Sequence, residues 1–434
     1  GEGLALGRLA ALDVRAGEPA RARERASEAI ALLRDTGQEH ALALAYQDRA
    51  AASERLGDLA AALEDAEEAG ELSERSGGAA AALRDRAVEL AVRLGRGRTA
   101  WAHAERAKAG LPAAGSARPG PAPGELDDVV AAGTATGVLG FYVSGGRVLV
   151  LAHRTGWAQP RAFGTRVGPE LLAAAGGEGR WGDDWALLGD LLLGDALDAL
   201  GDDLDVLYLV PYGELDRVPL HALAPGGRLL LERFPVAYAP SVAMLGGLTR
   251  RPRPDGRRSL VVGYAQDAAA RVAYENEAAE IARDGGQRAR TGREATAGLL
   301  EGDWERIHLA CQGAYDRADP FGSGVRLGDG LLTARRIAAM RIAAGLVVLG
   351  SCESGGAAPL GQALLHAGAG AAVMPMWPVG GEVRRAVTRR LHARVRDGAA
   401  PAQALREVTL AARDRHGPAR PDLWAAYVLV GLAA

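Results

Sequence analysis

The chain has 434 residues, of which 48% are hydrophobic and 24% charged, a composition typical of an ordinary globular protein with two or three domains. A formal net charge of −3 provides no basic field for nucleic acid or an anionic membrane. No apolar run reaches the roughly 18 residues that a transmembrane helix needs. The two cysteines, Cys311 and Cys352, are too few for a disulfide framework, so we expect a protein of the reducing cytoplasm.

The chain begins Gly1-Glu2-Gly3, without a methionine or a signal peptide, so we expect a fragment of a longer protein. Residues 1–110 are rich in Ala, Leu, Glu and Arg at helical spacing, and they contain an internal repeat. Gly17 and Gly57 are each followed by alanines at the same offsets, and Gly95 begins a weaker third copy. A glycine turn between two alanine-rich helices predicts stacked helical hairpins, which share a core and leave a concave face.

This repeat pattern resembles tetratricopeptide repeats, with Tyr46, Ala50 and Gly57 at the first-helix and turn positions of that motif. The spacing from Gly17 to Gly57 is longer than the family's period of about 34 residues, so we expect longer connections between the helices. A plain alanine-rich helical bundle is the alternative interpretation of residues 1–110.

Residues 111–124 are rich in Pro and Gly, cannot hold a helix, and are predicted to be a linker. In residues 125–434, short apolar runs alternate with helical patterns, which favours a mostly parallel sheet covered by helices on both faces. Strands are expected over Val138–Val143, Arg147–Ala152, Val206–Val210, Leu260–Gly263, Ile307–Cys311, Leu346–Gly350 and Ala371–Met376. Helices are expected over Asn276–Asp284, Thr333–Met340, Pro359–Ala367, Val383–Val395 and Pro401–His416.

Two loops carry candidate functional residues, because each follows a predicted buried strand. Gln312 and Gly313 follow one strand, and Ser351, Cys352 and Glu353 follow the next. In parallel sheets the chemistry lies beyond the carboxyl ends of the strands. The segment between the two loops is long enough for a crossover to an adjacent parallel strand. We therefore expect Cys352 to lie beside the tip of the strand that ends before Gln312.

Several ordered segments resemble the CHAT domain, a relative of caspases and separase, and the resemblance covers about residues 125–434. The fold that it implies is α + α/β, in which helical tetratricopeptide-like repeats precede a caspase-like domain with a mostly parallel sheet. The segments that carry the resemblance are His308–Gly313, Asp329–Thr333, Leu349–Ser354, Val373–Trp377, Leu209–Leu223, Tyr238–Ser241 and Trp424–Gly431.

The CHAT resemblance implies a cysteine endopeptidase with Cys352 as the nucleophile. The backbone amides of Gly313 and Cys352 would then form the oxyanion hole. The family's catalytic histidine position is occupied by Gln312, which neither lowers a thiol pKa nor moves protons. Loss of a general acid–base group costs about 10²–10⁴ in rate. Gln312 can still donate an amide hydrogen bond to a substrate carbonyl, so this site can hold a substrate without cutting it.

Acidic and polar side chains flank this site and are candidates for substrate binding. Relatives of this fold often prefer a basic residue before the cut, which a buried acid recognises. The candidates are Ser351, Glu353 and Asp316, with Asp319 nearby, and a solvated loop charge is the alternative interpretation of each acid.

No other histidine is expected to replace the missing one. His308 lies four residues before Gln312, or about 13 Å along a strand, and is expected to be a buried histidine at the start of that strand. His366 is expected to pack on the sheet or face solvent, and His221 to lie beneath the site. Cys311 is expected to be a small core side chain rather than a redox partner of Cys352.

The sequence has no phosphate-binding loop, zinc-protease motif or Cys-x-x-Cys pair, so we expect no metal and no cofactor. Three interpretations remain open. In the first, the repeats bind a protein partner and control access to Cys352, as in bacterial relatives that cut a dedicated partner in defence or cell death. In the second, a pseudo-protease or scaffold binds a protein or peptide uncut in the CHAT pocket. In the third, an engineered change from histidine to Gln312 traps a substrate.

Overall fold

The computed structural model describes residues 1–76, 81–109, 125–131, 134–175, 184–252, 258–316, 318–350 and 358–434. The chain divides into two compact units, one built mainly from Gly1–Leu111 and the other from Ala122–Trp157 with Phe163–Ala434. The predicted linker at 111–124 lies outside the described residues. Over the described ranges, no helix combines the length and the apolar character needed to cross a membrane.

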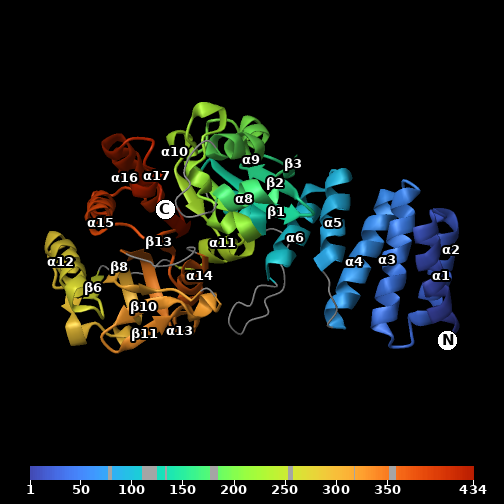
Figure 1. The fold of residues 1–434 in the computed structure, drawn as a ribbon, viewed down its shortest axis with the longest axis horizontal. Helices are drawn as coiled ribbons and strands as arrows, with labels where there is room; N and C mark the ends of the chain where they lie inside the picture. The colour runs from blue at the N-terminus through green and yellow to red at the C-terminus, as the bar shows by residue number, and fades with distance from the viewer. Residues whose placement is uncertain are drawn as a thin grey trace. The chain divides into compact units, whose positions relative to one another are not determined.

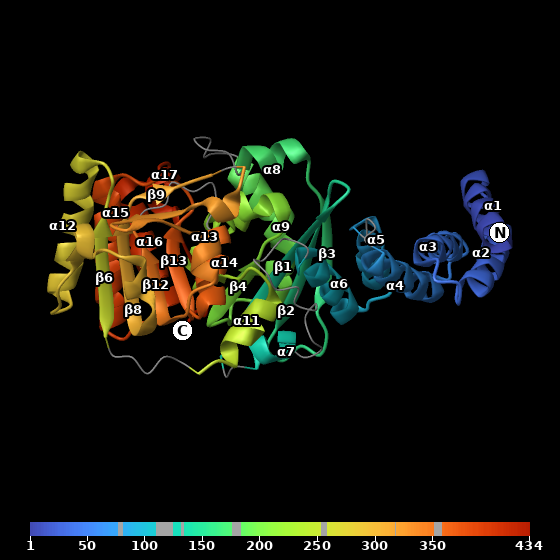
Figure 2. The ribbon, with the colours of Figure 1, turned by 90° about the horizontal axis from the view of Figure 1, so that it is seen from below.

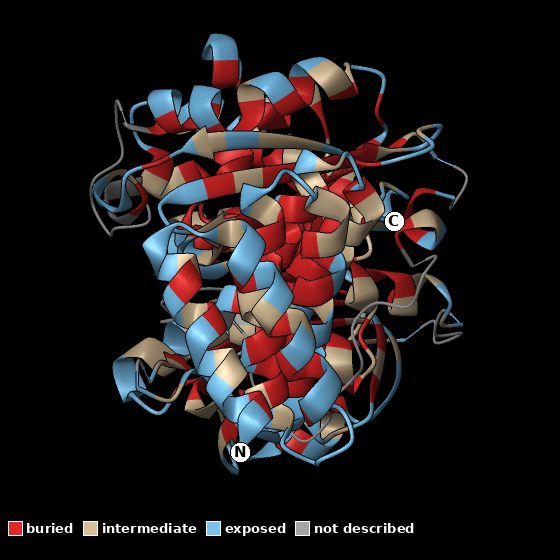
Figure 3. Ribbon diagram, turned by 90° about the vertical axis from the view of Figure 1, so that its right-hand side faces the viewer, coloured by how far each residue is buried: buried red, intermediate tan, exposed pale blue. Residues whose placement is uncertain are grey.

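The described part of the first unit consists of helices that pair as hairpins (Figure 1). The alanines of the predicted repeat lie at the contacts between helices, where Ala22, Ala62 and Ala100 are completely buried. Figure 3 shows helices with exposed residues on one side and buried residues on the other. The helices are α1 (Glu2–Ala16), α2 (Pro19–Leu33), α3 (Glu39–Arg55), α4 (Leu59–Arg75), α5 (Ala81–Arg93) and α6 (Gly97–Ala109).

The three repeat glycines make the same turn. Gly17, Gly57 and Gly95 have left-handed φ values of 80°, 83° and 68°, which glycine adopts at little cost. The expectation of longer connections was wrong. Only Gly17 and Glu18 separate α1 from α2, and the long repeat period instead reflects long helices, with 17 residues in each of α3 and α4.

The second unit is built on an 11-stranded sheet in the order β3-β2-β1-β4-β5-β14-β13-β12-β8-β6-β7. Strands β6, β8, β12 and β13 are parallel and lie side by side (Figure 2). Strands β1, β4 and β5 are parallel to one another, while β2 is antiparallel to β1 and β14 to β13. The strands are β1 (Thr136–Ser144), β2 (Arg147–Arg154), β3 (Arg161–Arg166), β4 (Val206–Val210), β5 (Val236–Tyr238), β6 (Ser259–Tyr264), β7 (Arg290–Thr291), β8 (Gly302–Cys311), β12 (Ile342–Leu349), β13 (Ala371–Pro375) and β14 (Tyr427–Gly431).

Helices cover both faces of the parallel strands, as the alternating pattern predicted. Figure 1 shows α12, α15 and α16 on one face and α13 and α14 on the other. The helices are α7 (Glu125–Val130), α8 (Pro169–Ala175), α9 (Asp184–Leu200), α10 (Leu230–Arg233), α11 (Val242–Thr249), α12 (Ala268–Asp284), α13 (Ala334–Ala338), α14 (Ala358–Ala367), α15 (Gly381–Arg396), α16 (Pro401–His416) and α17 (Pro421–Trp424). Short 3₁₀ helices span Gly213–Arg217, Leu220–Ala222, Pro225–Gly227, Gly292–Glu294, Ala297–Leu300 and Pro320–Gly322.

The predicted fold class is confirmed, but several predicted elements were too short. Strand β8 begins at Gly302 rather than Ile307. The prediction missed its first residues because they are exposed or half-buried and form no apolar run. Strand β12 begins at Ile342 rather than Leu346. Helix α12 begins at Ala268 rather than Asn276, since the Asp267 carboxylate accepts a 2.8 Å hydrogen bond from the Ala270 N–H and caps the helix.

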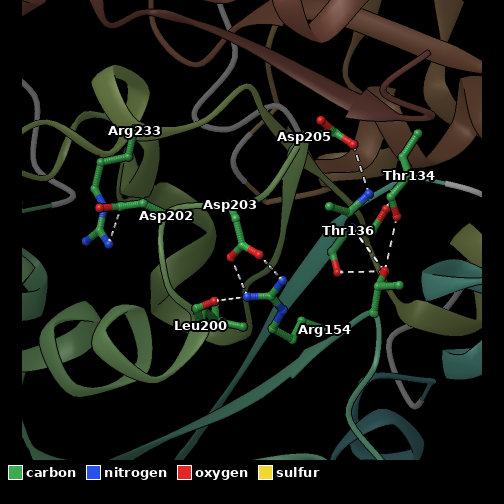
Figure 4. A network of polar contacts seen from close by, with 10 residues as sticks. Thr134, Thr136, Arg154, Leu200, Asp202, Asp203, Asp205 and Arg233 are labelled. Carbon is green, nitrogen blue, oxygen red and sulfur yellow. Dashed lines mark hydrogen bonds and ion pairs between the residues drawn. The ribbon is translucent and has the colours of Figure 1, made fainter.

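A network of polar contacts fixes the beginning of β1 and the segment before β4 (Figure 4). The guanidinium of Arg154, at the end of β2, donates to both carboxylate oxygens of Asp203 at 2.7 and 2.9 Å. Asp205 accepts a 2.9 Å hydrogen bond from the Ala135 N–H. The Asp205 contact joins the segments that enter β1 and β4, and the Arg154 contact joins the end of β2 to the same segment before β4. Together they stabilise the pairing of the two parallel strands.

Candidate active site

The two candidate loops leave neighbouring parallel strands, as the sequence predicted. Strand β8 pairs with β12 in a register that places Leu309 opposite Leu349. Beyond that pair, the Gly350 N–H donates a 2.9 Å hydrogen bond to the Leu309 carbonyl. Gln312 follows β8 directly. Cys352, with Ser351 and Glu353, lies outside the described residues, and Gly350 is the last described residue before it.

Gln312 is half-buried and hydrogen-bonded through its backbone and its side chain. Its N–H donates to the Tyr264 carbonyl at 3.0 Å, and its carbonyl accepts from the Arg326 N–H at 2.8 Å. The side-chain oxygen Oε1 accepts a 3.2 Å hydrogen bond from the Gln266 N–H. Gln266 follows β6, which lies on the side of β8 opposite β12. The amide oxygen of Gln312 is therefore engaged on the side away from β12.

Gly313 begins a small antiparallel sheet of strands β9 (Gly313–Ala314), β10 (Gly324–Leu327) and β11 (Gly330–Thr333). Gly313 is buried and lies opposite Val325. The chain thus passes from β8 through Gln312 directly into a second sheet. This pairing fixes the backbone on both sides of Gln312.

The acidic candidates after Gly313 take part in local contacts. The exposed Asp316 carboxylate accepts hydrogen bonds from the backbone N–H groups of Ala318 and Asp319, at 2.9 and 3.1 Å. Asp319 pairs with Arg335 at 3.0 Å, and this hydrogen bond holds the pKa of Asp319 below its ordinary value. Asp319 is therefore already paired with an arginine of the same chain, whereas the Asp316 carboxylate accepts hydrogen bonds from nearby backbone amides.

The other candidate side chains near the ends of β8 and β12 are buried or half-buried. Cys311 is completely buried, and burial raises the pKa of its thiol well above the usual range, which fits a core side chain. His308 is buried as predicted, but it lies in the second half of β8 rather than at its start, because β8 begins at Gly302. His366, on α14, is half-buried.

His221 is a buried neutral link between segments distant in sequence. Its Nε2 lies 3.0 Å from the Ala425 carbonyl, and its Nδ1 lies 2.9 Å from the Tyr238 hydroxyl. Because a carbonyl only accepts, Nε2 carries the proton and Nδ1 accepts from Tyr238. Burial lowers the pKa of His221 to about 4, so the imidazole stays neutral near pH 7.

Sequence reasoning missed a buried ionic cluster beside the tip of β12. Glu277, from α12, is 1% exposed, and its Oε2 accepts a 2.6 Å hydrogen bond from Arg384 Nε. Its Oε1 accepts from the Thr388 hydroxyl at 3.1 Å and lies 3.5 Å from His308 Nε2. Nδ1 of His308 is 3.1 Å from His392 Nε2. No local signal singled out Glu277, because α12 carries other acidic residues, such as Glu275 and Glu280.

At neutral pH Glu277 is ionised, whereas His392 is neutral. Burial raises the pKa of Glu277, but contact with His308 and the charge of Arg384 outweigh burial and leave this pKa below its ordinary value. Burial, followed by repulsion from His308, lowers the pKa of His392 well below its ordinary value. In the described parts of the chain, no group of three or more His, Cys, Asp or Glu side chains is arranged to hold a metal ion.

The chain has similarities to solved structures and to one protein-family model. Two structures of the Saccharomyces cerevisiae separase–securin complex, at 2.6 and 3.0 Å resolution, are similar, with TM-scores of 0.47 and 0.46 and sequence identities of 9% and 10%. The similarity covers 96% and 95% of this chain but only 38% and 37% of those chains. A comparison with curated proteins finds no match. The CHAT domain family model matches residues 185–432. Because that match covers more than half of the sequence, the chain is a member of the CHAT-domain family.

Proposed function

We propose that the chain is a CHAT-family module with a cysteine-endopeptidase site, in which Cys352 is the nucleophile and cutting is slow because Gln312 occupies the histidine position. The observation that supports this most directly is the 2.9 Å hydrogen bond from the Gly350 N–H to the Leu309 carbonyl. It joins the end of β12 to β8 three residues before Gln312. The two loops therefore leave the sheet next to each other, as a nucleophile and its partner require.

The chemistry of Gln312 accounts for the slow cutting. An unassisted cysteine has a pKa of about 8.5 and is only a few per cent thiolate at neutral pH. An amide cannot take up the thiol proton, and the amide oxygen of Gln312 is already bound to the Gln266 N–H. In this proposal the amides of Gly313 and Cys352 still receive a substrate carbonyl oxygen. Ser351, Glu353 and Asp316 flank the bound peptide.

A second candidate function is protein binding without any cutting. The engaged side chain of Gln312 favours it, because a glutamine held on the β6 side contributes to structure rather than to proton transfer. The two functions share one peptide-binding site after the carboxyl ends of β8 and β12. They differ only in whether Cys352 is acylated. We place the cutting function in bacterial defence or regulated proteolysis.

The repeat unit is proposed to bind the protein partner that controls this site. A groove of about 490 Å³ in this unit is lined by acidic side chains of α4, together with Arg49 and Arg106. Of these acids, Glu64, Glu68 and Glu71 are exposed and recur at helical spacing on one side of α4. A partner that co-purifies with the full chain and is lost from the Glu64→Lys/Glu68→Lys variant supports this role. Equal retention by both proteins contradicts it.

Cleavage assays test the proposed site. The chain, its Gln312→His variant and its Cys352→Ala variant are incubated with a panel of peptides that contain Arg or Lys. We expect slow Cys352-dependent cleavage by the chain and at least tenfold faster cleavage by Gln312→His. Binding of the peptides without cleavage by either protein supports the second candidate function. If none of these proteins binds or cleaves the peptides, both candidate functions are rejected.

A further inference from the structure

Gly350, the residue two positions before Cys352, is held on two sides by hydrogen bonds. Its N–H donates to the Leu309 carbonyl, and its own carbonyl accepts a 2.7 Å hydrogen bond from the Tyr427 hydroxyl. Tyr427 is 3% exposed and begins β14. It therefore joins the closing strand of the sheet to the backbone from which the nucleophile loop starts.

The Glu277 carboxylate occupies a third side of Gly350. A Cβ atom added to Gly350 would lie 2.8 Å from Glu277 Oε1, closer than such atoms approach in proteins. Only glycine fits this position without a shift of the carboxylate. Such a shift would disturb the hydrogen bonds that Glu277 accepts from Arg384 and Thr388 on α15.

Arg384 makes that carboxylate hard to move. It is 5% exposed, and its guanidinium lies over the Tyr274 ring at 4.1 Å, in addition to its bond with Glu277. Separating a buried ion pair leaves an uncompensated charge, which is strongly unfavourable. The surface of Glu277 that Gly350 contacts is thus rigid, since helices α12 and α15 hold it together.

We propose that Tyr427 and Glu277 are positioning residues for Cys352. The Tyr427 hydroxyl sets the orientation of the Gly350 carbonyl, and Glu277 sets how closely the backbone of Gly350 approaches α12. Together they fix the point from which the Cys352 loop departs. This inference rests on the proposed function. Because neither side chain is proposed to contact a substrate, their loss should slow the reaction of bound peptide with Cys352 and leave peptide affinity unchanged.

A matched pair of tyrosine variants tests this role in the full chain. Tyr427→Phe removes the hydroxyl that binds Gly350. Tyr208→Phe is the control, because the buried Tyr208 hydroxyl accepts a 3.1 Å hydrogen bond from the Ala433 N–H, beyond the other end of β14. Each variant loses one buried hydroxyl, so their stabilities should change by similar amounts. Both are made in the chain as it stands and in the Gln312→His background.

Two measurements are compared between these variants. The first is the kinetics of Cys352 labelling by a peptide that carries an electrophile, with Cys352→Ala as the blank. Tyr427→Phe should lower the maximal labelling rate about tenfold and change the apparent affinity less than about twofold, while Tyr208→Phe changes neither. The second is hydrogen exchange of the Gly350 amide, which should become about fivefold faster in Tyr427→Phe alone, as expected for the loss of one buried hydrogen bond.

Equal effects of the two variants on both measurements overturn the positioning role. If no protein shows Cys352-dependent labelling, the proposed function fails, and the exchange of the Gly350 amide still decides whether Tyr427 holds this backbone. If labelling occurs but neither the labelling rate nor the exchange distinguishes Tyr427→Phe from Tyr208→Phe, the proposed function stands and the positioning role is wrong.

Discussion

The Tyr427 hydroxyl donates a 2.7 Å hydrogen bond to the carbonyl of Gly350, a residue 77 positions earlier in the chain. The contact joins the first residue of β14 to the end of β12, across the intervening strand β13. Through this contact β14 supports the candidate site. The contact also holds the backbone of Gly350, which the residues next to Gly350 in the sequence do not reveal.

The close approach of Gly350 to Glu277 predicts that Gly350→Ala is destabilising. Its Cβ would lie 2.8 Å from Glu277 Oε1, and overpacking of this kind costs about 1–3 kcal/mol. The control is Gly247→Ala, because a Cβ on this residue of α11 meets no atom within 4 Å. Urea unfolding, followed by a signal from the second unit, measures the unfolding free energy of both variants. If Gly350→Ala is as stable as Gly247→Ala, the contact with Glu277 does not constrain the backbone.

The buried pair of Glu277 and Arg384 predicts an asymmetric response to substitution. Glu277→Gln leaves Arg384 buried without its countercharge, which should cost about 3–5 kcal/mol of unfolding free energy. The double variant Glu277→Gln/Arg384→Met removes both charges and should recover at least half of that loss. Denaturant unfolding measures the unfolding free energies of the parent, the single variant and the double variant. A double variant less stable than Glu277→Gln alone would show that the lone guanidinium is not the source of the loss.

The neutral, buried His221 predicts a loss of stability on acidification. Its folded pKa is about 4, whereas an unfolded histidine has a pKa of about 6.5, so between these values the unfolded chain binds more protons. The contribution of His221 is therefore complete above about pH 6.5 and decreases by about 3 kcal/mol as the pH falls to about 4.

Unfolding of the parent and of His221→Gln between pH 7.5 and 4.5 measures this contribution. Glutamine does not titrate, so the stability advantage of the parent should shrink as the pH falls. A difference that is constant with pH would mean that His221 titrates normally in the folded chain, and that its bonds to Tyr238 and Ala425 do not keep it neutral.

The repeat turns predict opposite effects for two glycine substitutions in the first unit. Gly57 has a φ of 83°, and a Cβ added to it meets no atom within 4 Å, so Gly57→Ala should cost about 1–2 kcal/mol through backbone strain alone. Gly70 lies inside α4, also with no atom within 4 Å of an added Cβ, and Gly70→Ala should stabilise the helix by up to about 1 kcal/mol. Thermal unfolding followed by circular dichroism compares them. A Gly57→Ala variant as stable as the parent would argue against the assigned turn geometry.

The sequence predicted best those elements whose signals are local. Helix α16 spans Pro401–His416 as expected, since a proline opens it and its apolar spacing is regular. The glycine turns of the repeats were visible for the same reason. The start of α12 was missed although Asp267 offered a capping signal, because the first three residues after it are all alanines and show no amphipathic pattern.

The candidate site was predictable only in part. Strand ends and the CHAT resemblance placed Gln312 and Cys352 at one edge of a sheet. Nothing local reveals that Tyr427 contacts Gly350, or that Glu277 of α12 pairs with Arg384 of α15, since these contacts depend on the tertiary packing of distant elements. The engagement of Gln312 by the Gln266 backbone likewise follows from the pairing of β6 with β8.

The central claim is that Cys352 is a nucleophile whose reactivity is limited by Gln312. The most direct measurement is the rate at which a peptide electrophile labels Cys352, compared between the chain and Gln312→His at pH 7. The account predicts labelling that is absent from Cys352→Ala, slow in the chain and at least tenfold faster in Gln312→His. Equal labelling rates in the chain and in Gln312→His, or labelling that persists in Cys352→Ala, would contradict it.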